Sequence, residues 1–115
     1  MNNQFSFWSI INDDKKPSFI IAELSANHNG DIKRALTTID MAKAMGADAV
    51  KIQTYTADTM TIDCNNSDFI VQSGLWSGYK LYDLYNEAHT PFEWHSELYR
   101  YAHEIGITLF STPFD

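Results

Sequence analysis

The 115-residue sequence has one cysteine and no long apolar run. Cys64 has no second thiol with which to form an internal disulfide, and no histidine or basic residue adjoins it to activate a nucleophile. No apolar stretch approaches the roughly 20 residues that cross a bilayer. Residues 1–17 lack the basic start and apolar stretch of a signal peptide. We therefore expect no membrane partner and a reducing, cytoplasmic location.

Positive charge is scarce. Eight Lys and Arg residues stand against 15 Asp and Glu residues, so the net charge is −7. Nucleic-acid phosphates favour clustered basic side chains, so the composition argues against a nucleic-acid partner. A small phosphorylated substrate is compatible with this charge, because one lysine in a concave site can outweigh the average charge of the surface.

Three short apolar segments that end in polar residues are expected to be strands. They are Ser18–Leu24, Ala47–Thr54 and Ile107–Thr112. The passages AKAMGADAVKIQT and AHEIGITLFSTP share one design, in which a helix is followed by a glycine, an apolar strand and a polar strand end. This repetition predicts an α/β fold with three parallel strands and right-handed crossover helices.

Two crossover helices are expected between these strands. The first is Asp31–Met45, which has one apolar face and ends at Gly46. The second should follow the sequence Thr90-Pro91-Phe92-Glu93, which matches a capping box with proline in the first helical position. It should run to about Glu104 and end at Gly106. Its inward-facing residues should be Leu98, Ala102 and Ile105.

A segment of about 35 residues separates the second strand from the second crossover helix, which is longer than an ordinary connection. It is rich in aromatic residues and contains a predicted short helix, Lys80–Ala88. Long connections after the carboxyl ends of parallel strands are typical places for substrate pockets. The Trp and Tyr residues from Trp76 to Tyr101 could line such a pocket or simply pack the helices, and the second interpretation is the simpler one.

Three parallel strands alone would leave both sheet edges open and one face poorly covered. We therefore expect residues 18–115 to be the N-terminal portion of a larger (β/α)8 TIM barrel. Residues 1–17 would be a leader, with a strand or hairpin around Phe5–Ile11.

Polar residues at the strand ends are the candidates for chemistry, because the carboxyl ends of barrel strands converge on one rim. Lys51 and Gln53 lie on the same side of their strand, and a lysine within an apolar strand is costly without a partner or ligand. Glu23 ends the first strand, where it could pair with Lys51 or stabilise charge during a reaction. Lys51 could also be a surface residue of an edge strand. Ser111 and Thr112 end the third strand.

The histidines give no metal-binding pattern. His95 and His103 are eight residues apart, which places them two turns apart on one helix and too far apart to hold one ion. His28 lies in the turn Asn27-His28-Asn29-Gly30, where it could bind a ligand or serve only the turn. We expect no metal site formed by this segment alone.

Three motifs together resemble the sialic acid synthase family. They are IAELSANHNG, GADAVKIQTY and FSTPFD, in the order and spacing of the first three strand ends of that family. The intervening GLW and KLYDLYNEAHTPFEWH are similar to the pseudaminic acid synthase branch more than to N-acetylneuraminate synthases. The resemblance covers roughly Phe19 to Asp115.

The resemblance implies a TIM barrel with a small antifreeze-like C-terminal domain, working as a homodimer. Such enzymes condense phosphoenolpyruvate with an open-chain amino sugar, release phosphate and form a nine-carbon 2-keto sugar acid. In the pseudaminic branch the sugar is a 2,4-diacetamido-trideoxy-altrose. A divalent metal, Mn²⁺ or Mg²⁺, polarises the aldehyde, and the two metal-binding histidines of the family have no match in this segment.

The resemblance also assigns roles to the strand-end residues. Glu23 would stabilise the cationic intermediate, and Lys51 would hold the carboxylate or phosphate of phosphoenolpyruvate. Gln53 would face the sugar. Thr112, with Ser111 as a weaker candidate, would bind phosphoenolpyruvate, and Phe114 would help to form the substrate pocket. His28 is a further substrate-binding candidate, from its place in the turn and not from the resemblance.

Three alternatives stay open. The sugar could be that of an N-acetylneuraminate synthase, which carries fewer acetamido groups. The chain could also be a truncated, non-catalytic product that associates with other chains, or one that binds a sugar without chemistry.

Overall fold

A computed structural model describes residues 13–115 of the chain. Its sheet has three strands in the order β1 (Ile21–Glu23), β2 (Ala49–Thr54) and β3 (Thr108–Pro113), and both pairings are parallel. The predicted parallel strands are confirmed. The predicted hairpin at Phe5–Ile11 lies outside the described residues.

β1 is shorter than the seven residues predicted. At its start, the Asp48 carboxylate accepts a hydrogen bond from the Ile20 N–H at 2.7 Å, while the Ile20 carbonyl accepts from the backbone of Asp48 and Ala49. The Asp48 side chain thus replaces a backbone carbonyl as the acceptor for Ile20, and the regular pattern of strand hydrogen bonds does not extend to this residue. The strand is regular only from Ile21 to Glu23.

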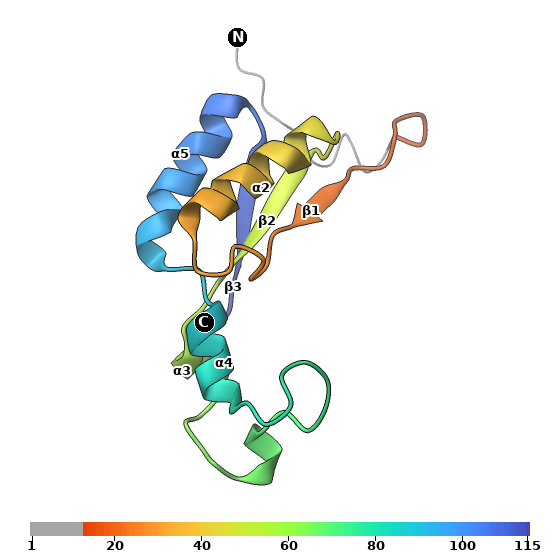
Figure 1. Ribbon diagram of the computed structural model, residues 1–115. Coiled ribbons are helices and arrows are strands. Elements are labelled where there is room, and N and C mark those ends of the chain that lie inside the picture. Colours follow the sequence, from red (N-terminus) through yellow and green to blue (C-terminus); the bar gives the residue numbers. More distant parts are fainter. Residues whose placement is uncertain (1–12) are drawn as a thin grey trace.

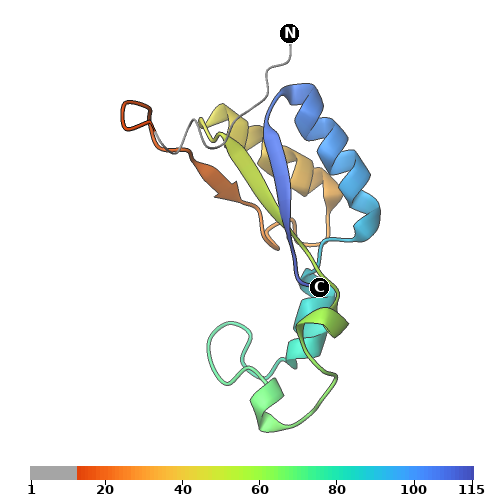
Figure 2. The same ribbon diagram turned by 180° about the vertical axis from the view of Figure 1, so that it is seen from behind.

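The helices α2 (Ile32–Ala44) and α5 (His95–Ile105) cover one face of the sheet. They lie in front of the strands in Figure 1, whereas the strands lie in front in Figure 2, the view from behind. Between the helices and the sheet lies a core of buried apolar side chains, contributed by all three strands or their ends and by both helices. Its members are Leu24, Ala35, Ile39, Val50, Ile52, Leu98, Ala102, Ile107 and Leu109.

Both helices end in the way the sequence predicts. Gly46 and Gly106 have φ values of +91° and +75°, a region that favours glycine. After each glycine the chain folds back, and the N–H of Ala47 and of Ile107 donates to the carbonyl of Ala42 and Ala102 respectively. This pattern is the Schellman motif, which turns the chain from helix into strand.

The start of the last helix differs from the prediction. A 3₁₀ helix, η2 (Phe92–Trp94), precedes α5, and no side chain caps either of them. The predicted capping box at Thr90 is therefore wrong. Thr90 is 2% exposed and its hydroxyl is hydrogen-bonded to His28 at 3.2 Å, so a tertiary contact uses the group that would have capped the helix.

The connecting segment, residues 55–89, extends beyond the carboxyl ends of the strands (Figure 1). It contains α3 (Ala57–Met60), the 3₁₀ helix η1 (Ser67–Phe69) and α4 (Leu81–Ala88), which confirms the predicted short helix. Lys80 joins its parts, with Nζ at 2.7 Å from Asp63 and 3.5 Å from Asp83. In residues 13–115, no helix has the length and apolar character needed to cross a membrane.

Candidate functional site

Lys51 and Glu23 meet on adjacent strands. The parallel register places Glu23 beside Lys51, and the Lys51 ammonium lies 3.0 Å from the Glu23 carboxylate. The two side chains are 27% and 57% exposed, so both can still contact a ligand. The pair lies toward the carboxyl ends of β1 and β2, the side of the sheet where α/β barrels bind substrates.

Gln53 and Thr112 extend this polar surface. Side chains alternate along β2, and Val50 and Ile52 are fully buried against the helices, so Lys51 and Gln53 lie on the opposite face. Gln53 is paired with Thr112 in the register of β3. Four of the predicted residues, Glu23, Lys51, Gln53 and Thr112, therefore share the face without a covering helix in residues 13–115.

Ser111 lies on the other face. It is paired with the buried Ile52, and its hydroxyl is hydrogen-bonded to the Thr54 hydroxyl. Thr54 is in turn 2.7 Å from Nε2 of His95, the first residue of α5. The structure thus separates Ser111 from the face that carries Lys51.

The hydrogen bonds run from Ser111 through Thr54 and His95 to the Pro91 carbonyl, and that carbonyl determines which group donates in each of them. A carbonyl oxygen can only accept, so His95 Nδ1 donates to the Pro91 carbonyl at 3.2 Å. With a single ring proton, Nε2 accepts from the Thr54 hydroxyl, and Thr54 accepts from Ser111. The chain joins the ends of β2 and β3 to the start of α5. His95 and Thr54 were missed as positioning residues, and the polar end of the second strand was the only signal in the sequence.

His28 is fully buried, with 0% exposure. Its Nδ1 accepts from the Gly30 N–H at 3.1 Å, so its proton is on Nε2 and is donated to the Thr90 hydroxyl. Its ring stands edge-on to Trp94 at 5.2 Å. Burial, with a smaller contribution from His89, lowers the pKa of His28 below its usual value. In this structure the ring joins the loop after β1 to Thr90, the residue that follows the connecting segment.

Phe114 follows β3 and is 38% exposed. Its ring stands edge-on to Tyr55 at 5.6 Å, and Tyr55 stands edge-on to Tyr85 of α4 at 5.9 Å. Burial, followed by the influence of Tyr85, raises the pKa of Tyr55. These ring contacts link Phe114, after β3, to the connecting segment.

Within residues 13–115, no three His, Cys, Asp or Glu side chains converge in a way that could hold a metal ion. No residue of this segment is therefore assigned to the divalent metal that the resemblance implies.

Comparison with known proteins decides the family. The model of the NeuB family matches residues 38–115, which is more than half of the chain. The chain belongs to the NeuB family. This NeuB family chain is 55% identical to the pseudaminic acid synthase of Campylobacter jejuni over 103 residues, which are 90% of this chain and 30% of that protein. It is 46% identical to the pseudaminic acid synthase of Helicobacter pylori over 99 residues, 86% of this chain and 29% of that protein.

A solved structure supports the same relation. The N-acetylneuraminic acid synthetase of Leptospira borgpetersenii, crystallised with citrate, matches with a TM-score of 0.68 and 30% identity over 87% of this chain and 30% of that one. The fold prediction is confirmed, because the three parallel strands with their helices correspond to part of the TIM barrel of the sialic acid synthases. The NeuB chain spans about 30% of the length of these relatives.

Proposed function

We propose that the chain supplies the first three strand ends of an active site that condenses phosphoenolpyruvate with an open-chain 2,4-diacetamido sugar, the reaction of a pseudaminic acid synthase. The observation that carries the proposal is the Lys51–Glu23 pair, which lies with Gln53 and Thr112 on one face at the carboxyl ends of parallel strands. The 55% identity to the Campylobacter jejuni pseudaminic acid synthase supports this choice of sugar.

Lys51 binds the phosphoenolpyruvate carboxylate or phosphate. An ammonium group has three donors, and one of them faces Glu23, so two are free to make charge-assisted hydrogen bonds to an anion. Its partial burial strengthens these bonds, because water competes less at a site of lower dielectric constant. Thr112 adds a hydroxyl donor from the neighbouring strand, and Gln53 presents its amide to the sugar.

Glu23 stabilises positive charge. In the condensation, C3 of phosphoenolpyruvate forms a bond to the sugar aldehyde carbon, the aldehyde oxygen takes a proton, and C2 becomes cationic. Water adds to C2, and phosphate then leaves as the 2-keto group forms. A carboxylate held at the strand end by Lys51 is suitably charged to stabilise the cationic C2.

The location, oligomeric state and metal proposed here are those of the complete protein. It would act in the cytoplasm as a homodimer and would use Mn²⁺ or Mg²⁺. This part rests on the family resemblance, and no residue of the present segment is assigned to the metal or to the dimer contact.

The test is a hybrid enzyme, in which the matched segment of the Campylobacter jejuni pseudaminic acid synthase is replaced by its counterpart from this chain. With phosphoenolpyruvate, Mn²⁺ and the diacetamido sugar it should release phosphate and form a product whose mass contains both acetamido groups. A hybrid that unfolds cooperatively yet releases no phosphate would refute the proposal. Turnover of N-acetylmannosamine in preference would favour the N-acetylneuraminate alternative.

Lys51→Ala in the hybrid should lower kcat/KM for phosphoenolpyruvate by about 100-fold, since hydrogen bonds to charged groups contribute up to ~3 kcal/mol. Lys33→Ala is the matched control. It removes the same charge from an exposed position on α2 and should leave the kinetics unchanged.

A further inference from the structure

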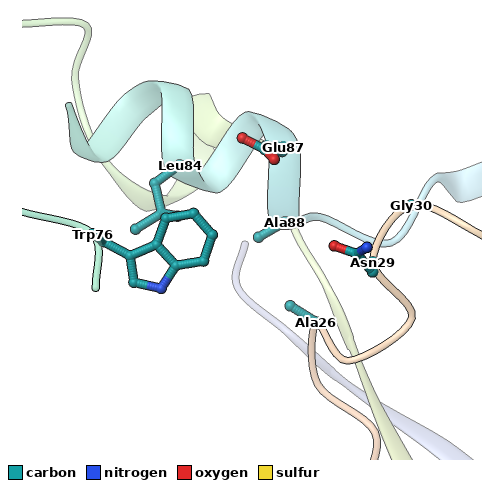
Figure 3. Close-up of a pocket in the computed structure, with 7 residues that line it drawn as sticks. All are labelled: Ala26, Asn29, Gly30, Trp76, Leu84, Glu87 and Ala88. Carbon is teal, nitrogen blue, oxygen red and sulfur yellow. The ribbon is translucent and has the colours of Figure 1, made fainter. Parts of the chain in front are cut away.

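A pocket of about 130 Å³ lies between the loop after β1 and the helix α4. Figure 3 shows the Trp76 indole beside the Leu84 side chain, with Asn29 and Gly30 at the opposite side. Its lining residues come from the loop after β1 and from the connecting segment, which are far apart in the sequence: Ala26, Asn29, Gly30, Trp76, Leu84, Glu87 and Ala88. The pocket exists only because the connecting segment folds against the first strand-to-helix loop.

The size of the pocket limits its ligand. Pockets for whole drug-sized ligands measure about 300–1,000 Å³, so this one is too small for an entire sugar. It is close to the roughly 150 Å³ of an engineered protein cavity that binds benzene, a molecule with six heavy atoms. A single substituent with a few heavy atoms therefore fits, and the rest of the ligand lies outside.

The chemistry of the lining points to an amide that carries a methyl group. The side chains of Ala26, Leu84 and Ala88 present apolar surface for a methyl group. Asn29 and Glu87 are exposed, and neither side chain makes a hydrogen bond or ion pair with another residue in the range 13–115. The Asn29 amide can donate to a carbonyl oxygen, and the Glu87 carboxylate can accept from an N–H.

One side of the pocket lies close to the candidate site along the chain. Ala26 follows Glu23 by three residues, so their Cα atoms are at most about 11 Å apart. A six-carbon sugar whose aldehyde lies near Lys51 and Glu23 can therefore extend toward the pocket. Glu23 and Ala26 belong to one strand end and the loop that continues it.

We infer that this pocket binds one of the two acetamido groups of the sugar and thereby selects the diacetamido sugar over sugars with a hydroxyl at that position. The inference rests on the proposed function, which supplies a sugar with acetamido substituents. A hydroxyl would leave the apolar walls of the pocket in contact with water. Its donor and acceptor also share one oxygen atom, whereas the N–H and the carbonyl oxygen of an acetamido group are separate and can reach Glu87 and Asn29 independently.

The inference is tested with a substitution that fills the pocket in the hybrid enzyme. Ala88→Leu adds a side chain inside the lining, and Asn86→Leu adds the same side chain to an exposed position of α4 outside it. Kinetics are measured with the diacetamido sugar and with two analogues in which one or the other acetamido group is replaced by a hydroxyl. Trp76→Ala, which opens the pocket at a residue 47% exposed, is the second variant and is not expected to impair folding.

Ala88→Leu should raise KM for the diacetamido sugar about tenfold, with KM for phosphoenolpyruvate unchanged within about twofold. One of the two analogues lacks the acetamido group that enters the pocket, and Ala88→Leu should change KM for that analogue little. Trp76→Ala should reduce the preference for the diacetamido sugar in the same way, and Asn86→Leu should change nothing. Equal effects on all three sugars, or none on any, would overturn the inference.

A binding measurement separates this inference from the proposed function. If the hybrid releases no phosphate, the proposed function fails, and saturation-transfer NMR with the diacetamido sugar still tests the pocket. Saturation of one acetyl methyl group that is lost in Ala88→Leu and kept in Asn86→Leu would support it. No difference between the two variants would refute it.

Discussion

The sheet with its two helices and the connecting segment are held together in different ways. All nine residues of the main buried cluster belong to the sheet, its helices or the turns between them. In the connecting segment, Tyr55 and Ala57 are buried at its start, but α4 and η1 contain no buried residue. Its contacts include the ion pair of Lys80 with Asp63, the hydrogen bond of the Tyr82 hydroxyl with Asp58 at 3.1 Å and the edge-on contact of the Tyr55 and Tyr85 rings.

The two regions differ in what they contribute, since one supplies most of the stability and the other supplies residues of the pocket. Apolar burial is the dominant favourable contribution to folding, whereas exposed ion pairs contribute little. The layer of sheet and helices therefore forms a rigid support for Lys51 and Glu23. The connecting segment carries Trp76, Leu84, Glu87 and Ala88 of the pocket, and loops on rigid scaffolds commonly hold binding residues.

The largest expected effect tests the buried layer. Leu98 is 0% exposed, and Leu98→Ala should lower the free energy of unfolding by about 2–5 kcal/mol, because it removes apolar contacts and leaves a cavity. Ile62 in the connecting segment is 62% exposed, and Ile62→Ala should change it by less than about 0.5 kcal/mol. Urea unfolding of the hybrid enzyme measures both. Comparable losses would mean that the two regions are equally important for stability.

The next effect tests the junction of the two regions. Thr90→Val keeps the shape of the side chain but leaves the buried Nε2–H of His28 without an acceptor, at a cost of about 1–3 kcal/mol. Thr37→Val is the control, since the Thr37 hydroxyl donates only to an exposed helix carbonyl, that of Lys33. The same unfolding measurement applies. A neutral Thr90→Val would show that the junction does not depend on this bond.

His28 should make the stability depend on pH. Burial lowers its pKa in the folded state, so the unfolded chain binds the proton more readily. The contribution is complete above the unfolded value of about 6.5 and is lost as the pH falls from there toward the folded pKa. The slope for one proton is at most about 1.4 kcal/mol per pH unit. Comparing His28→Gln with the parent hybrid between pH 7 and 5 should show a smaller acid loss in the variant.

The smallest effect compares two glycines of similar backbone conformation. Gly106 ends α5 with φ +75°, and Gly78 lies in the connecting segment with φ +86°. A Cβ at either position meets no close contact, so Gly→Ala costs mainly the backbone strain, about 1–2 kcal/mol. Gly106→Ala should lower the global stability by this amount. Gly78→Ala should instead speed proteolysis of the connecting segment with little change in the unfolding midpoint. Identical shifts of the unfolding midpoint in Gly106→Ala and Gly78→Ala would contradict the difference between the two regions.

Much of the fold was determined by local sequence. The apolar face of Asp31–Met45, the glycines after both helices and the polar ends of apolar strands each act over a few residues, and the elements they predict are present. Strand alternation likewise placed Lys51 and Gln53 on one side, because the side-chain period of a strand does not depend on distant parts of the chain.

The tertiary structure alone decided which distant groups meet. Thr90 had the sequence of a helix cap, but His28, far away in the sequence, uses its hydroxyl. Ser111 and Thr112 are neighbours with similar side chains, yet opposite faces of β3 direct one to Thr54 and His95 and the other to the face of Lys51. The pocket of Ala26, Trp76 and Ala88 has no local signal at all, since the loop after β1 and the connecting segment are brought together only by packing. Local patterns fix what each element is, whereas the competition of side chains for partners is settled only when the chain has folded.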